Sequence, residues 1–179
     1  MRSPTVPSIL GVLCLIALPA HASDDAVKEA RETADVFRKA DPGIDRFFKS
    51  SAGYVVFSTV GKGAIGVGGA GGSGVVFEKD APIGKASLGQ VTIGFQLGGQ
   101  AYSELIFFET PAALTAFKKG NFALAAQASA VALSAGAAAT AKYEKGVAIF
   151  TITKTGLMYE ASVGGQKFGF EPFRKRDGG

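Results

Sequence analysis

The sequence predicts a β-dominated α+β fold: a small antiparallel β-barrel with about three helices packed on its surface. Hydrophobic residues alternate with polar or small ones over residues 91–97 and 157–163, the pattern of strands with two different faces. Residues 54–60, 105–108 and 147–152 carry apolar residues on both sides of the chain, as expected for strands that helices cover from outside. Glycines recur along these segments and permit close backbone approach in a strongly curved sheet. Together these patterns favour a closed barrel.

Three helices are predicted from their start signals and spacing. Residues 24–40 have apolar positions at helical intervals, with an aspartate as N-cap. A second, short helix over residues 42–51 follows Asp41 as its N-cap and has proline at its first position. Thr110 and the proline after it repeat this signal, so that a third helix covers residues 111–119 before a closing glycine.

One segment, residues 121–141, fits two structures. Its alanine content favours a helix, whereas alternating residues from Phe122 onward fit a strand, and the residues alone leave both open. Small residues and Gly136 within residues 134–140 indicate a mobile connection.

The glycine-dense stretch over residues 61–74 has three interpretations: a phosphate-binding loop, glycine-rich β structure at the wall and rim of the barrel, or a flexible linker. Gly66, Gly68 and Gly71 satisfy the spacing G-x-G-x-x-G. That motif must open a helix, however, whereas the next residues, 75–77, read Val-Val-Phe and favour a strand. A phosphate-binding loop is therefore disfavoured.

The first 22 residues have the pattern of a cleaved secretory signal peptide. Arg2 precedes a short apolar core, and residues 20–22 read Ala-His-Ala, a small-x-small cleavage site. The core is well short of the roughly 20 residues needed to span a bilayer, so that a retained anchor is the weaker alternative. We therefore expect cleavage before Ser23 and a single domain over residues 23–179. The protein would be exported to the periplasm or cell envelope, or secreted.

Several kinds of chemistry are disfavoured. The single cysteine, Cys14, and the single histidine, His21, both lie in the predicted leader. A mature domain without them has no disulfide, no Ser-His-Asp triad, no Cys-His pair and no usual zinc site. The glutamates, Glu104 among them, are interpreted as exposed residues near strand ends rather than as an acid–base pair. We expect no enzyme activity, no cofactor and no metal.

Five blocks of residues, in this order, resemble the lipid-binding SYLF domain of bacterial and eukaryotic proteins. They read GYVVF, GKGA, GGAGGSGVV, SLGQVTIG and GLMYEASVGGQKF, beginning at Gly53, Gly61, Gly68, Ser87 and Gly156. The resemblance covers nearly the whole chain after the leader. It implies a β-barrel core with surface helices and the binding of anionic lipids, phosphoinositides in eukaryotic members, and it favours strand for the segment from Phe122.

Two departures from the family pattern stand out. The chain has no tryptophan, so that the interfacial anchor that members commonly carry before the SLGQ block is missing. The basic N-terminal helix implicated in lipid contact in eukaryotic relatives corresponds here to residues 24–40, where acidic residues slightly outnumber basic ones. Actin binding, reported for some relatives, is not carried over to this chain.

The residues expected to contact lipid are lysines that lie beside glycines or apolar tips. The chain has a net charge of +4, which attracts anionic surfaces weakly and is too small for a nucleic-acid footprint. The sequence predicts non-enzymatic binding of anionic phospholipids, with a structural or protein-binding envelope component as the alternative. The candidate lipid-binding residues are Lys62, Lys85, Lys118, Lys119, Lys142 and Lys145.

Overall fold

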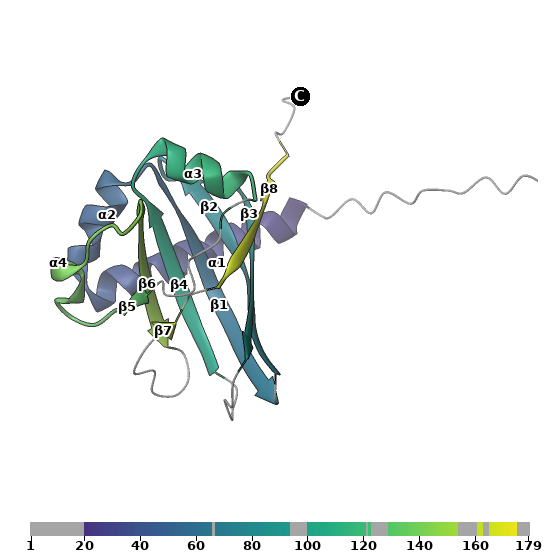
Figure 1. The fold of residues 1–179 in the computed structure, drawn as a ribbon. Coiled ribbons are helices and arrows are strands. Elements are labelled where there is room, and N and C mark those ends of the chain that lie inside the picture. Colours follow the sequence, from purple (N-terminus) through teal and green to yellow (C-terminus); the bar gives the residue numbers. More distant parts are fainter. Residues whose placement is uncertain are drawn as a thin grey trace, which may run out of the picture.

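The computed structural model gives a mixed α/β fold that is rich in strands (Figure 1). The structure describes residues 20–65, 67–93, 100–120, 122, 129–153, 161–162 and 165–174. The predicted leader therefore lies almost entirely outside the described residues. None of the described helices combines the length and apolar character needed to cross a membrane.

Eight strands form one sheet with the order β7-β5-β6-β4-β1-β2-β3-β8. Neighbours pair antiparallel, except that β5 runs parallel to β6. The strands are β1 (Gly53–Ile65), β2 (Val67–Glu78), β3 (Ala81–Ile93), β4 (Gln100–Phe108), β5 (Ser129–Ala132), β6 (Val147–Thr153), β7 (Ala161–Ser162) and β8 (Lys167–Pro172).

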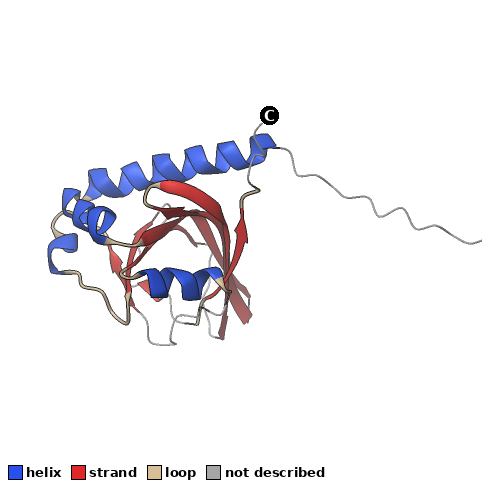
Figure 2. Cartoon of the chain, turned by 90° about the horizontal axis from the view of Figure 1, so that it is seen from above, coloured by secondary structure: helices blue, strands red, loops and turns tan. Residues whose placement is uncertain are grey.

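The sheet curls strongly but is not closed into a barrel, so that the prediction of a closed antiparallel barrel is wrong in this respect (Figure 2). The end strands β7 and β8 do not pair with each other within the described residues.

The glycine-dense stretch forms two long paired strands rather than a phosphate-binding loop. β1 and β2 pair along their whole lengths, with Ile65 opposite Val67 at the tip. Gly74 allows close approach of the backbones, because a Cβ built there would lie 2.5 Å from the carbonyl oxygen of Val56. The interpretation as glycine-rich β structure is therefore confirmed.

The three predicted helices are present, with adjusted ends, and a fourth was not predicted. Asp41 accepts a hydrogen bond from the Gly43 N–H at 2.9 Å, and Thr110 caps its helix through the Ala113 N–H at 3.2 Å. Asp24 lies inside the first helix and does not cap it. The helices are α1 (Ala20–Ala40), the 3₁₀ turn η1 (Pro42–Ile44), α2 (Asp45–Ser50), α3 (Pro111–Lys118) and α4 (Ala137–Thr140).

The core has two parts, one on each face of the curled sheet. Helices α1, α2 and α4 cover the convex face, where Phe37 and Phe47 pack with Phe107 of β4 among other residues. Helix α3 lies across the mouth of the hollow (Figure 2), where Phe117 packs with Phe168. Because both faces are covered, the central strands β1, β4 and β6 bury apolar residues on both faces, as the sequence predicted.

The connection over residues 134–140 is anchored, contrary to the prediction of a mobile segment. Ala138 of α4 is completely buried, and its N–H donates to Asp41 Oδ2 at 2.7 Å. The Arg46 guanidinium donates to the carbonyl oxygens of Ala138 and Ala141. The anchoring groups come from a distant part of the chain, which a local pattern does not reveal.

The other predicted strands are described only in part. Strand β3 covers the first residues of the predicted strand 91–97 and ends at Ile93, and the rest lies outside the described residues. Of residues 157–163, only Ala161 and Ser162 are described, as β7. Within residues 121–141, β5 is a strand, whereas Phe122 is not in one and instead packs against Phe117.

Candidate functional site

Four of the six candidate lysines lie at one end of the sheet, the upper end in Figure 1. At this end β1 begins, β2 turns into β3, β4 ends and β6 begins, because Gly53 pairs with Phe108 and Phe108 pairs with Val147. We call this the α3 end of the sheet, since α3 follows β4 there. Lys118 and Lys119 end α3, and Lys142 and Lys145 precede β6.

The four lysines at the α3 end differ in their exposure and in whether an acidic residue pairs with them. Lys118 is partly buried, and its Nζ lies 3.0 Å from Glu78 Oε2, so that its charge is already paired. Lys119, Lys142 and Lys145 are exposed. Lys145 has a φ of 51° in the turn before β6, which fixes the path of the chain there.

Lys62 and Lys85 are not brought to the α3 end. Lys62 lies on β1 opposite Ala70 and Gln100, on the side of the β1–β2 tip, and its side chain lies outside the described residues. Lys85 is half-buried on β3 and lines a cavity of about 180 Å³ beneath α1, where Glu29 is also present. Both lysines have glycine as a chain neighbour, as the sequence shows, and both lie on paired strands rather than in loops.

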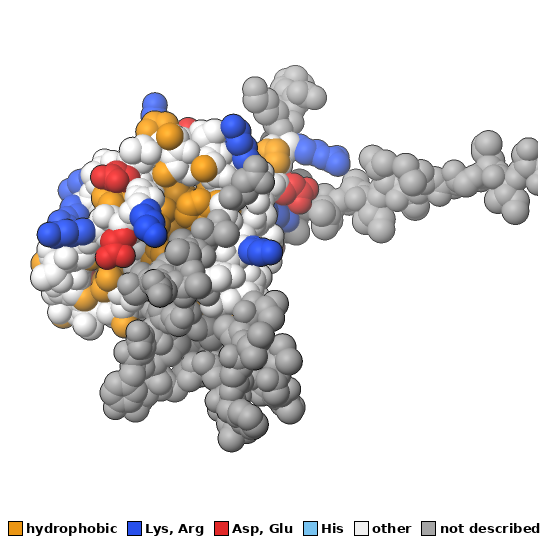
Figure 3. All heavy atoms as spheres, viewed as in Figure 1, with side chains coloured by type: hydrophobic (Ala, Val, Ile, Leu, Met, Phe, Trp, Pro, Cys, Tyr) orange, Lys and Arg blue, Asp and Glu red, His pale blue; other side chains and the backbone are white. Residues whose placement is uncertain are grey.

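Three further basic residues lie at the α3 end and were missed by the sequence analysis. Arg46 and Lys49 are exposed on α2, and Lys79 lies in the turn between β2 and β3. Lys79 and Asp80 have φ values of 50° and 63°, as in a two-residue hairpin turn of the mirror-image type. The Lys-Asp pair between two strand patterns was the available signal for this turn. In Figure 3, which shows the molecule from the same side as Figure 1, basic side chains lie over the upper and left parts of the surface, with acidic ones between them.

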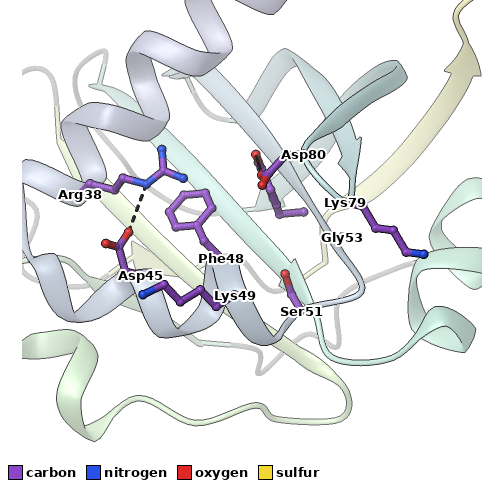
Figure 4. Close-up of a pocket in the computed structure, with 9 residues that line it drawn as sticks. Arg38, Asp45, Phe48, Lys49, Ser51, Gly53, Lys79 and Asp80 are labelled. Carbon is purple, nitrogen blue, oxygen red and sulfur yellow. Dashed lines mark hydrogen bonds and ion pairs between the residues drawn. The ribbon is translucent and has the colours of Figure 1, made fainter.

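A cavity of about 480 Å³ lies among α1, α2, the start of β1 and the β2–β3 turn (Figure 4). Arg38 forms one wall, with its Nε 3.2 Å from Asp45 Oδ1 and its guanidinium 3.8 Å from the centroid of the Phe48 ring. The residues that line the cavity are Arg38, Asp45, Phe48, Lys49, Ser51, Gly53, Tyr54, Lys79 and Asp80.

Tyr54 and Asp80 form a second internal pair in this cavity. The Tyr54 hydroxyl donates to Asp80 Oδ1 at 2.9 Å, and Arg31 donates to the backbone carbonyl of Asp80 at 3.0 Å. Burial, followed by the hydrogen bond to Asp80, raises the pKa of Tyr54 well above its ordinary value. The phenol therefore stays protonated and remains a hydrogen-bond donor at neutral pH.

Three groups of the cavity have no internal partner. Ser51 Oγ is inaccessible to solvent and makes no hydrogen bond within the described part of the chain. Lys49 and Lys79 form no ion pair with any described residue. In Figure 4, Lys79 points away from the other lining side chains, so that it marks the rim rather than the interior.

Glu104 is completely buried, and its interpretation as an exposed residue near a strand end is wrong. It lies in the hollow of the curled sheet, where Gln166 Nε2 donates to its Oε2 at 3.0 Å and to the Tyr102 hydroxyl at 3.3 Å. Burial, and then the charge of Glu104, raises the pKa of Tyr102. The available signal was alternation along β4, because Glu104 shares one face of the strand with Tyr102, Ile106 and Phe108.

No group of three or more His, Cys, Asp or Glu side chains suited to a metal ion is found among the described residues.

Comparison with known proteins points to one family. Residues 89–171 match the model of the Ysc84 (SYLF) family, which is described as a Las17-binding protein and actin regulator. The chain is also similar to Beta cell expansion factor A of Aeromonas veronii, with 35% identity over 72 residues. That match covers 40% of this chain and only 28% of the relative's length.

Proposed function

Since residues 89–171 carry the domain of the Ysc84 (SYLF) family, we propose that the protein binds anionic phospholipid surfaces, without catalysis, through the α3 end of its sheet. The observation that carries the proposal is the topology, which collects lysines from distant parts of the sequence at this one end. Lys49, Lys79, Lys119, Lys142 and Lys145 are all exposed there.

The charge balance at this end supports weak, salt-sensitive binding. A basic residue near an anionic membrane contributes about 1 kcal/mol, so that a few exposed lysines supply a modest total. Glu109 and Glu144 lie at the same end, and their negative charges reduce the attraction to an anionic membrane. Lys118 contributes little, because Glu78 already neutralises it.

Phosphoinositides are one class of lipid with the required negative charge. We propose the periplasm or cell envelope as the location of the protein.

Co-sedimentation with vesicles tests this function. Replacing Lys142 and Lys145 with glutamine should lower binding to phosphatidylglycerol vesicles about tenfold or more, as expected for two lost contacts with the surface. A matched control replaces Lys28 and Lys167, which are exposed elsewhere, and should bind as the unmodified protein does. Binding should also weaken steeply between 0.1 and 0.5 M salt, because the Debye length of about 10 Å at 0.1 M shortens further.

The outcome that contradicts the proposal is equally definite. If both double variants bind vesicles alike, and if salt has no effect, the α3 end is not an electrostatic membrane surface. The family description would then favour a protein partner, which a saturable interaction that survives removal of lipid would reveal.

A further inference from the structure

The cavity at the α3 end carries charges of both signs around one hollow. Arg38 and Lys49 line it from α1 and α2, while Asp80 lines it from the β2–β3 turn. In Figure 4, the Asp80 carboxylate lies on the side of the hollow that Phe48 also borders. A ligand in this cavity therefore meets cationic and anionic groups together.

After the internal contacts are counted, one acidic and one basic group of the cavity can still bind a ligand. Asp45 is already occupied by Arg38, but among the described residues the Asp80 carboxylate accepts one side-chain hydrogen bond, from Tyr54, and a carboxylate can accept about four. Lys49 has three donor hydrogens and no ion pair within the described residues. Ser51 Oγ has no hydrogen-bond partner among the described residues but is closed to solvent, so that a ligand is expected to contact Lys49 and Asp80 instead.

We propose that this cavity binds a zwitterionic phosphate group of the phosphoethanolamine type, with its phosphate on Lys49 and its ammonium on Asp80. The proposal rests on the proposed function and deepens it. The exposed lysines of the α3 end attract the membrane, and the cavity selects among headgroups once the protein is there.

The mixed charge argues against simpler ligands. An anion without an ammonium would approach two carboxylates, those of Asp45 and Asp80, and a simple cation would approach Arg38 and Lys49. A volume of about 480 Å³ is much larger than a phosphate ion needs and lies in the range of small-molecule sites, about 300–1,000 Å³. The cavity therefore has room for the glycerol portion of a headgroup.

Soluble headgroups without acyl chains test the cavity separately from the membrane surface. We would titrate the protein with glycerophosphoethanolamine, glycerophosphoglycerol and glycerophosphocholine, and follow amide chemical shifts by NMR. The first should bind tightest, with shifts at Lys49 and Asp80. The second lacks the ammonium, and the third lacks N–H donors for the Asp80 carboxylate, so that both should bind about tenfold more weakly.

Asp80→Asn is the decisive variant because it removes the charge and keeps the turn. Asparagine tolerates a positive φ, here 63°, and its side-chain oxygen can still accept from the Tyr54 hydroxyl. It should lose most of the preference for glycerophosphoethanolamine over glycerophosphoglycerol. Lys49→Gln should weaken both ligands, whereas Lys39→Gln, outside the cavity, should change neither.

The results separate the two proposals. Equal binding of glycerophosphoethanolamine and glycerophosphoglycerol, an unchanged preference in Asp80→Asn, or no binding of any soluble headgroup would each overturn the cavity proposal. Vesicle binding that still depends on Lys142 and Lys145 would then leave the surface function intact. Conversely, soluble headgroup binding with no affinity for phosphatidylglycerol vesicles, with or without added phosphatidylethanolamine, would uphold the cavity for a free phosphoester and remove the membrane function.

Discussion

Asp41 Oδ2 accepts a hydrogen bond from the backbone N–H of Ala138 at 2.7 Å, while its Oδ1 accepts from the Gly43 N–H at 2.9 Å. One carboxylate therefore caps the turn η1 and fastens α4 to it. Asp41 is buried, so that water cannot easily replace either bond.

Replacing Asp41 with alanine should destabilise the protein by about 3 kcal/mol, because a cap and a buried hydrogen bond are lost together. Urea unfolding followed by circular dichroism measures this change. Asp41→Asn keeps one acceptor oxygen and should cost less. Amide exchange should show faster exchange at Ala138 in Asp41→Ala. A loss below about 0.5 kcal/mol would mean that α4 is held by its other contacts.

Gly74→Ala should be strongly destabilising, because the new Cβ would lie 2.5 Å from the Val56 carbonyl oxygen and 2.8 Å from Phe57 Cδ1. The backbone of a paired strand must move to relieve this contact, which we expect to cost about 2 kcal/mol or more. Gly71→Ala is the matched control, since its nearest contact would be an ordinary 3.7 Å. Thermal unfolding of the two variants compares them directly, and equal melting temperatures would contradict the close approach of β1 and β2.

Glu104→Ala should cost about 2–4 kcal/mol, because it leaves a cavity and removes the acceptor of a buried Gln166 hydrogen bond. Glu104→Gln keeps the shape and one side-chain oxygen, and we expect it to be much milder. Urea unfolding of both variants is the measurement. If alanine and glutamine cost the same, the contact with Gln166 is not what stabilises this part of the sheet.

The stability of the protein should fall as the pH rises above about 10. Burial raises the pKa of Tyr54 and Tyr102 in the folded state, whereas the unfolded tyrosines titrate near 10. Above that pH the unfolded state loses protons that the folded state retains, so that the free energy of unfolding decreases. Tyr54→Phe should make the decrease between pH 9.5 and 11, measured by urea unfolding, shallower. An unchanged slope would show that the Tyr54 hydroxyl is not held in its protonated form by the fold.

Local signals in the sequence were sufficient for the three predicted helices and the central strands, but not for α4. Asp41 and Thr110 mark helix starts through side-chain capping, which involves residues two or three positions away. Gly120 has a φ of 70° just after α3, as the closing glycine required. The family resemblance found through the order of short blocks is confirmed for residues 89–171.

Features that depend on distant partners were not predictable in the same way. The order of the strands places β7 and β8 at opposite ends of the sheet, and the burial of Glu104 depends on Gln166 reaching across the hollow. The cavity at the α3 end combines α1, α2 and a hairpin turn, so that no single pattern contains it. The grouping of Lys119 with Lys142 and Lys145 likewise follows from strand register, not from spacing.

The position of β8 has a consequence for the order in which the chain acquires its structure. β8 lies beside β3, with Phe168 opposite Leu88, although β4 and β6 and the helices α3 and α4 come between them in the sequence. Such long-range pairing is intrinsically slow, because a large loop must close before any contact forms. During synthesis on the ribosome, β3 therefore waits with an open edge, and such an edge is a template for pairing with other chains. The risk of misassembly lasts until β8 has emerged and covers this edge.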